Sequence, residues 1–452
     1  EQKVNDHPAS ADPTTPIADH QEQRVNDHLA TVNLTIPIAN PDARVPTNHL
    51  KSHGLDLIQR IKMPNAIEIP YMFKLLGSIF LAFLLFGIAM IFIKKTRDKR
   101  QQNTIVRPHE SLIPFPQTAP LPEGALSAGI NSYEERTQTI RDQYRAWLER
   151  YILSTYDNRG AFVRVGVERK RLRYQVTTTS LAQSFAMLQS VLIAGDDLSA
   201  PDRFERLLAF TIAYPSNHSE DLSSWMTMPD MTSSAKLEAD PHAEAWIAYS
   251  LLMAEKQWKT GRNFNYDRVL DYRLKALLAL QQDIEPVDHK RAIYAPVFFE
   301  AFAKRSNSEA WLALAESLRE ELLKNIQDAE LVSDGSAEEA WLAFSAFHVG
   351  MAGLLLDDEN HKKLAKRFES LVYSAIKNLP AKLENAEDDG LSPLALIAAC
   401  APLAMLQNDQ DLVDKYWQVL STFNAKSRDA IGESLRLLAL MVMNGHFWRL
   451  TA

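Results

Sequence analysis

The sequence predicts an all-α protein whose main domain spans residues 133–452. Two observations support this class. Apolar residues recur at spacings of three and four in successive segments, which is the pattern of an amphipathic helix. Turn residues separate these segments, and strand signals are rare. About 320 residues of helix pairs predict one continuous core, arranged either as a closed toroid or as an open solenoid.

The helical segments follow one another from Tyr133 towards the C-terminal end. In chain order they are YEERTQTIRDQYRAWLERYIL, TSLAQSFAMLQSVLIAG, HAEAWIAYSLLMAEKQW, SEAWLALAESLREELLKNI, AEEAWLAFSAFHVGMAGLLL, LSPLALIAACAPLAML and LVDKYWQVLSTF. Cys400 is the only cysteine of the chain, so no intrachain disulfide can form. Its apolar surroundings predict a buried, inert thiol.

A membrane-spanning helix is predicted over residues 73–95. Its centre, Leu75 to Ile93, is a run of 19 residues without a charge, which fits a hydrocarbon core of about 30 Å. A buried core helix or a signal peptide explains the run less well, because it is apolar on every side and follows a long polar segment. Five cations follow the run within seven residues, against three nearby before it. The positive-inside rule therefore places residues 94–452 in the cytoplasm.

The segments on either side of this helix are not expected to bury a core. Residues 1–72 are polar and contain an imperfect 21-residue repeat, KVNDHPASADPTTPIAD and RVNDHLATVNLTIPIAN, which predicts a disordered arm. His7 and His28 of this repeat lack the spaced partners of a zinc site, so no metal is expected. Residues 96–132 contain five prolines and predict an extended linker.

Charge and motifs exclude several function classes. The net charge of -8 leaves no large basic face for phosphates, so no nucleic-acid partner is expected. The sequence shows no nucleotide-binding loop and no nucleophile with a base at a fixed spacing. No cofactor is therefore expected, and the predicted partners are the membrane and other protein subunits.

Four motifs of the helical domain resemble those of family 8 glycoside hydrolases, of the type encoded with bacterial cellulose synthase. TTTSLAQSFAM from Thr177 resembles the family's TTSEGQSYAM, and HAEAWIAYSLLMAEKQWK from His242 is similar to SDADLWIAYSLLxAGRLWK. IYAPVFFEAFAK from Ile293 resembles SYLPPQLLxRFA, and KYWQVLSTF from Lys415 resembles a late YYxxVLxLF. The resemblance covers about 290 residues and implies an (α/α)6 barrel with a sugar groove across the inner helix ends.

The same resemblance implies an inverting hydrolase with two carboxyl groups. The family's acid falls on Leu181, and the first Asp of SDADLW falls on His242, while the second becomes Glu244. A looser alignment of AWLAFSAFHVGM places Trp341 on the family's base. Leucine, histidine and tryptophan cannot fill these roles in the family mechanism. The prediction is therefore a catalytically inactive protein, with no catalytic residues.

A glycan groove is the remaining site predicted. Its candidate residues are Gln183, Trp246, Tyr249 and Glu244, since aromatic faces and polar side chains suit sugar rings. The alternative for the large apolar members is plain packing of inner against outer helices.

The predicted function is a membrane-anchored, catalytically inactive cellulase-like subunit of a bacterial envelope complex for cellulose-type exopolysaccharide synthesis or secretion. It would act as a scaffold or hold a polysaccharide. Two alternatives are an active β-glucan hydrolase with relocated carboxylates, Glu244 with Glu338 or Glu339, and a secretion or pilus component without sugar. The predicted location is the bacterial inner membrane, with one span. The charge rule makes the helical domain cytoplasmic, whereas analogy with the family makes it periplasmic.

Overall fold

A computed structural model describes residues 110–450 except residues 171–172, 229–236, 284–292, 327–336, 357, 383–391 and 424–428. The predicted arm, the predicted span and the first part of the predicted linker, together residues 1–109, lie outside the described residues. Within the described part of the chain, no helix combines the length and the apolar character needed to cross a bilayer.

The described residues are mostly helical. In chain order the elements are α3 (Tyr133–Tyr151), β1 (Ile152–Ser154), β2 (Ala161–Val163), β3 (Gly166–Lys170), β4 (Arg173–Thr179), α4 (Ser180–Leu192), α5 (Ala200–Ala213), β5 (Met226–Thr227), α6 (Pro241–Trp258), α7 (Tyr266–Gln282), α8 (Pro296–Ser306), α9 (Ala310–Asn325), α10 (Ala337–Leu355), α11 (Glu359–Arg367), α12 (Glu369–Lys382), α13 (Pro393–Ala404), α14 (Gln410–Thr422) and α15 (Ala430–Met443).

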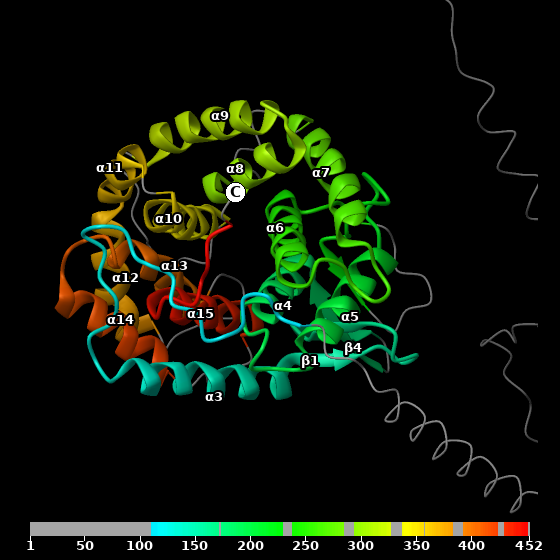
Figure 1. Cartoon of the computed structure of the whole chain (residues 1–452), viewed down its shortest axis with the longest axis horizontal. Coiled ribbons are helices and arrows are strands. Elements are labelled where there is room, and N and C mark those ends of the chain that lie inside the picture. The colour runs from blue at the N-terminus through cyan, green and yellow to red at the C-terminus, as the bar shows by residue number, and fades with distance from the viewer. Residues whose placement is uncertain are drawn as a thin grey trace, which may run out of the picture. The chain divides into compact units, whose positions relative to one another are not determined.

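These helices form two concentric rings (Figure 1). The inner ring contains α4, α6, α8, α10, α13 and α15, and the outer ring contains α3, α5, α7, α9, α11, α12 and α14. Each inner helix packs against the next, and the last, α15, packs against the first, α4. The ring is therefore closed, which confirms the predicted helical toroid and excludes the open solenoid.

The inner and outer helices differ in how much of their surface is buried. Nearly every side chain of α4, α6, α13 and α15 is buried, because an inner helix is covered by two neighbours and by the outer ring. The outer helices α3, α7 and α14 bury one face only, as their amphipathic pattern predicts. Asp240, Ser392 and Asp429 accept backbone N–H groups at the starts of α6, α13 and α15. These caps fix where the inner helices begin.

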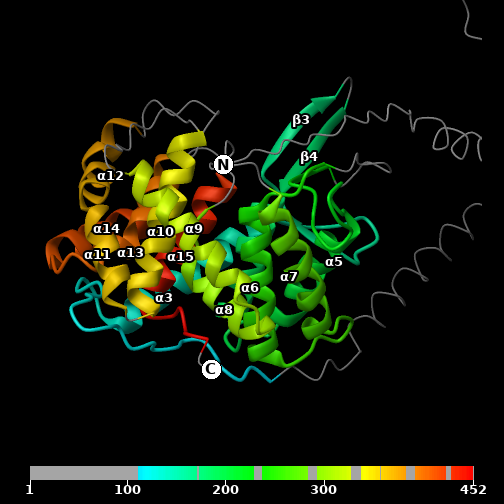
Figure 2. The ribbon, with the colours of Figure 1, turned by 90° about the horizontal axis from the view of Figure 1, so that it is seen from above.

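Short antiparallel strands lie beside the start of α4. β1 pairs with β2, and β3, β4 and β5 form a second sheet. The hairpin of β3 and β4 projects from this end of the domain (Figure 2). The sequence did not predict these strands, since runs of two to seven residues carry little alternation to recognise.

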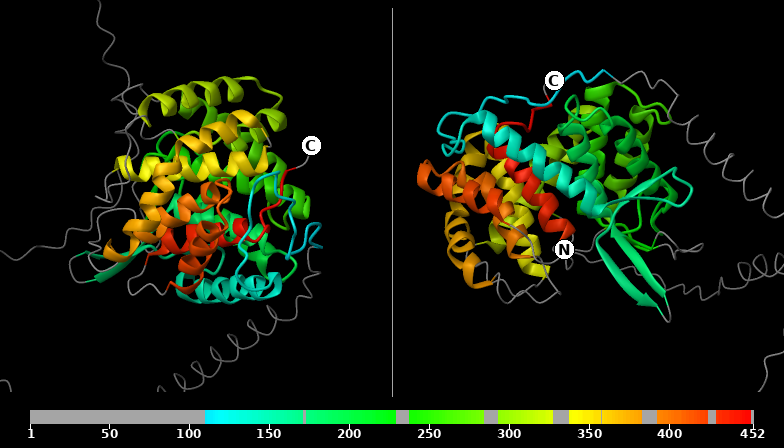
Figure 3. Two further views of the ribbon diagram at one scale, coloured as in Figure 1. Left: turned by 90° about the vertical axis from the view of Figure 1, so that its left-hand side faces the viewer. Right: turned by 90° about the horizontal axis from the view of Figure 1, so that it is seen from below.

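Residues 110–132, which the sequence placed in a linker, pack against the opposite end of the ring (Figure 3). Their backbone N–H groups donate to the carbonyls of Gln257, Ala194, Gly445 and Met405, at distances of 2.7–3.2 Å. These four residues end α6, α4, α15 and α13, so all four helices finish on the same side. We call residues 110–132 the strap, the end where inner helices begin the N-terminal mouth, and the end beneath the strap the C-terminal mouth.

Candidate active site

The three positions that the sequence aligned with family carboxylates lie in the first turns of inner helices, at the N-terminal mouth. Leu181 is the second residue of α4, His242 the second residue of α6, and Trp341 lies early in α10. Leu181 is partly buried, whereas His242 and Trp341 are buried. The ring thus brings helix starts together that are far apart in the chain.

His242 belongs to a compact aromatic cluster inside the ring. Its Nε2 lies 3.0 Å from Nε2 of His348 and accepts a 2.8 Å hydrogen bond from the Trp246 indole. Phe344 packs on the His242 ring at a centroid distance of 4.7 Å. Burial lowers the pKa of His242 to about 3, so the ring is neutral at pH 7 and is held as a hydrogen-bond acceptor.

Two of the predicted groove residues, Gln183 and Trp246, are packed within the core. The Gln183 side chain accepts from the Val163 amide and donates to the Ala161 carbonyl, which fastens β2 to α4. Trp246 is fully buried, with Phe185 and Phe298 against its ring. Neither side chain contributes to an open surface in this structure. Tyr249, the third, lies further along α6 and faces a cavity described below.

Glu244, the fourth predicted residue, is 0% exposed and points towards the outer ring. Its carboxylate forms an ion pair with Arg273 of α7 and accepts the Ser223 amide at 2.8 Å. Burial raises the pKa of this carboxyl, and the Arg273 guanidinium opposes that shift. Because both oxygens are engaged away from the mouth, Glu244 joins α6 to α7 and is not placed to act on a substrate. In this structure, the Glu244 carboxylate of the suggested pair is bound to Arg273 and to the Ser223 amide.

Glu339 lies in the first turn of α10 and is buried. The side chain of Glu338 lies outside the described residues. Glu339 thus lies at the same mouth as His242 and Leu181, on α10, which is separated from α6 by α8.

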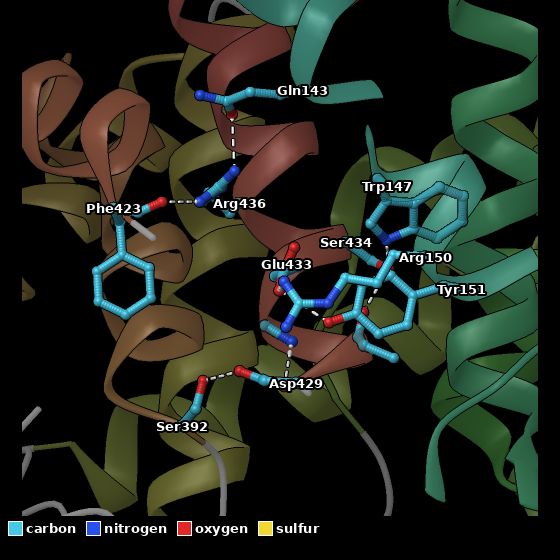
Figure 4. A network of polar contacts seen from close by, with 12 residues as sticks. Gln143, Trp147, Arg150, Tyr151, Ser392, Phe423, Asp429, Glu433, Ser434 and Arg436 are labelled. Carbon is cyan, nitrogen blue, oxygen red and sulfur yellow. Dashed lines mark hydrogen bonds and ion pairs between the residues drawn. The ribbon is translucent and has the colours of Figure 1, made fainter. Parts of the chain in front are cut away.

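Two further carboxyl groups, which the sequence analysis did not single out, lie one helical turn apart at the start of α15 (Figure 4). Asp429 caps this helix by accepting the Gly432 amide at 2.8 Å, and the Ser392 hydroxyl at the start of α13 donates to it. Burial raises the pKa of Asp429 above its ordinary value. This carboxyl is therefore more easily protonated than an exposed aspartate.

Glu433 has the opposite surroundings. Arg150 at the end of α3 forms a 3.0 Å ion pair with it, and the Tyr151 hydroxyl donates to the same oxygen at 2.8 Å. A cation and a donor both favour the ionised form of a carboxyl. Burial, with the bond to Glu433, raises the pKa of Tyr151, so the hydroxyl keeps its proton.

The sequence signal for this pair was weak. An Asp four residues before a Glu, followed by LRLLALMVM, indicates a helix start and nothing more. Only closure of the ring places Arg150, Tyr151 and Ser392 around the two carboxyls. A carboxyl pair whose surroundings favour protonation of one member and ionisation of the other has the property required for acid and base roles. Among the described residues, no group of three His, Cys, Asp or Glu side chains could hold a metal ion.

Comparison with known proteins identifies relatives of the first half of the helical domain. Residues 127–282 match the family described as glycosyl hydrolases family 8. An endoglucanase of Bacillus sp. (strain KSM-330) is 26% identical over 155 residues, which are 34% of this chain and 33% of that protein. A β-glucanase of Niallia circulans is 25% identical over 155 residues, 34% of this chain and 36% of that protein. The matched region is about a third of the length of these relatives.

Solved structures resemble the domain over a longer stretch. The apo structure of a β-1,3-1,4-glucanase from Paenibacillus sp. X4 covers 76% of this chain and 100% of its own, with a TM-score of 0.61 and 17% identity. A cold-adapted family 8 xylanase in complex with substrate covers 72% of this chain and 94% of its own, with a TM-score of 0.52 and 15% identity. At these identities, the likeness shows a shared fold.

These findings overturn the prediction of a catalytically inactive protein that rested on Leu181, His242 and Trp341. The matched family is one of hydrolases, and the two relatives are named for hydrolysis of glucans. The physical weakness of the prediction is that it assigned roles position by position, whereas a carboxyl can reach the same mouth from another inner helix. Residues 127–282 are thus similar to glycosyl hydrolases family 8, and the closed helical ring shares its fold with the solved glucanase and xylanase structures.

Proposed function

We propose that the domain is a glycoside hydrolase that cleaves β-linked glucan at the N-terminal mouth. The observation that carries this proposal is the carboxyl pair Asp429 and Glu433, held in contrasting surroundings at the start of the last inner helix. The relatives named endoglucanase and β-glucanase support a glucan as the substrate.

In this proposal, Asp429 is the proton donor. Hydrolysis breaks the bond between the anomeric carbon and the glycosidic oxygen, and the leaving oxygen needs a proton. Asp429 supplies it, and water forms the new bond to the anomeric carbon. The proton lost by that water passes to an ionised carboxyl, a role that we give to Glu433. Tyr151 and Arg150 hold the Glu433 carboxylate in position through their hydrogen bonds.

Reducing-end release from carboxymethylcellulose and mixed-linkage β-glucan tests the proposal. We expect the Asp429→Asn and Glu433→Gln variants each to lose about 10²- to 10⁴-fold in kcat, the usual worth of an acid or base. Asp411→Asn, an exposed change near the start of α14, is the matched control and should keep full activity. Circular dichroism and the unfolding midpoint show whether each variant is folded.

Two outcomes separate the alternatives at the same mouth. Activity that survives in both carboxyl variants but is lost in Glu339→Gln would transfer the acid or base role to α10. A folded wild-type protein that releases no reducing ends from either glucan would overturn the hydrolase proposal.

Membrane attachment through residues 73–95, and a place in an envelope complex that makes or exports a glucan, remain part of this proposal. The apolar run and its flanking cations support attachment. A hydrolase of exported glucan would require the domain on the outer side of the inner membrane, whereas the charge rule favours the cytoplasm. A reporter fused after Ala452 distinguishes the two: activity confined to the periplasm would reject the cytoplasmic orientation.

A further inference from the structure

A cavity lies at the C-terminal mouth, where α6, α8 and α10 end. Its volume is about 690 Å³, which is within the range of sites for small ligands. The floor is apolar and includes Leu252, Val297 and Leu355. Figure 3 shows the strap and the C-terminal residues at this end and the β3–β4 hairpin at the other, so this cavity is separate from the proposed catalytic mouth.

Tyr249 adds a polar group to the lining of the cavity. Its side chain is 1% exposed and stacks on Phe298 at a centroid distance of 4.1 Å. Tyr249 lines the cavity. No hydrogen bond joins its hydroxyl to another described residue, so this hydroxyl is available to a ligand.

The rim of the cavity carries charges of both signs. Lys256, Lys304 and Arg449 line the cavity together with Glu300. Within the described residues, neither lysine is placed in an ion pair, and Arg449 donates to the Leu354 carbonyl at 2.9 Å. The rim therefore offers several donors together with a carboxylate acceptor.

Arg305 also lines the cavity but adds little free charge. It forms ion pairs with Asp271 at 3.0 Å and with Asp267, and a longer one of 3.7 Å with Glu255. Three carboxylates thus balance its single charge.

The helix ends decide what kind of ligand the rim suits. Three inner helices finish here, and each C-terminal end carries roughly half a negative charge. Together with Glu300, these ends offset most of the three free cations. A strongly anionic ligand would therefore gain little. A neutral ligand with many hydroxyl groups would find both donors and acceptors, and its apolar face would lie on the leucine and valine floor.

We propose that this cavity is a non-catalytic glycan-binding site for a short neutral oligosaccharide. The choice of a β-glucan as that oligosaccharide rests on the proposed function. The Tyr249 hydroxyl and the rim groups bind sugar hydroxyls, and the site holds the polymer at the end of the ring opposite to the one that cleaves it. Tyr249 thus contributes to a sugar site at the C-terminal mouth, apart from Gln183 and Trp246.

Binding of thio-linked cellotetraose, which is not hydrolysed, tests the site. The full-length chain is kept in a sugar-free detergent and titrated by calorimetry. Tyr249→Phe removes only the hydroxyl and should weaken binding about fivefold, the worth of one hydrogen bond of about 1 kcal/mol. Val297→Trp fills the cavity and should abolish this binding event, while reducing-end release from short soluble substrate stays unchanged.

The Asp429→Asn variant is the matched control at the other mouth and should retain the Tyr249-dependent event. Binding that neither Tyr249→Phe nor Val297→Trp alters would overturn the proposal, as would tighter binding of tetragalacturonate than of the neutral sugar. If the protein binds the oligosaccharide through Tyr249 but does not hydrolyse glucan, only the catalytic proposal is rejected. If it hydrolyses glucan but shows no Tyr249-dependent binding, only the glycan-binding proposal is rejected.

Discussion

His242 and His348 meet inside the ring, where both side chains are buried. Burial lowers the pKa of His242 to about 3 and that of His348 well below its ordinary value. The unfolded chain, in contrast, takes up protons near pH 6.5. The unfolded state therefore binds more protons than the folded state below that pH, and stability falls as the pH decreases from about 6.5 towards 3.

We expect the free energy of unfolding to fall by about 1.4 kcal/mol per pH unit for each of the two histidines. Urea unfolding of the wild type and of His348→Leu between pH 7.5 and 4.5 measures this slope. The difference between the two proteins removes the contribution of carboxyl groups elsewhere. Parallel curves for the two proteins would contradict the assignment of a neutral, buried His348.

The ion pair between Glu244 and Arg273 is buried on both sides. Removal of one partner leaves the other charge uncompensated, so Glu244→Gln and Arg273→Met should each cost about 3–5 kcal/mol in unfolding free energy. The double variant should cost much less than the sum, because no buried charge is left alone. Urea unfolding of the four proteins measures the coupling. Additive losses would show that the pair is not coupled.

At the scale of elements, α10 packs against α13 at Gly350. A Cβ at Gly350 would lie 2.7 Å from the backbone nitrogen of Leu403 and from Cβ of Pro402, whereas a Cβ at Gly353 would meet the flexible end of Leu406. Alanine favours a helix interior by about 1 kcal/mol over glycine. Only at Gly350 must the neighbouring backbone move to accept it.

Gly350→Ala should therefore destabilise the domain by about 1–3 kcal/mol, the usual cost of overpacking. Gly353→Ala, one turn along the same helix, should be neutral or mildly stabilising and serves as the matched control. Thermal unfolding of both variants gives the comparison. Equal midpoints would indicate that α10 and α13 adjust freely at this contact.

The caps of three inner helices are local features of the chain. Asp240, Ser392 and Asp429 each precede an apolar run and each caps a helix, because a cap acts within one turn of the chain. The partners of these caps were not readable. The Ser392 hydroxyl reaches Asp429 across 37 residues, and this contact depends on where α13 and α15 lie in the ring.

For the whole domain, the strap makes contacts with the ring that the sequence did not predict. Its prolines indicated an extended segment, which is correct, but extended backbone can also pack when its N–H groups find carbonyl acceptors at helix ends. Phe115 and Ala128 are buried by this packing. The Gln117 side chain also donates to the Leu192 carbonyl at 3.1 Å.

A protein that begins at residue 133 should therefore be less stable than one that begins at residue 110. Without the strap, the last carbonyls of α4, α6, α13 and α15 lose backbone partners, and the apolar surface under Phe115 becomes exposed. We expect a lower urea midpoint and binding of a hydrophobic dye by the shorter protein. Identical unfolding curves would show that the strap adds nothing to the ring.

The sequence alone determined the helical class and the resemblance to family 8 glycoside hydrolases, because helix periodicity and short motifs act over neighbouring residues. Only the tertiary structure decided which polar side chains meet. Glu244 became part of a buried ion pair with Arg273, Asp429 and Glu433 acquired contrasting surroundings, and Tyr249 came to face a cavity. The reason is that ionisation and exposure depend on neighbours brought together by closure of the ring, and that closure joins residues hundreds of positions apart.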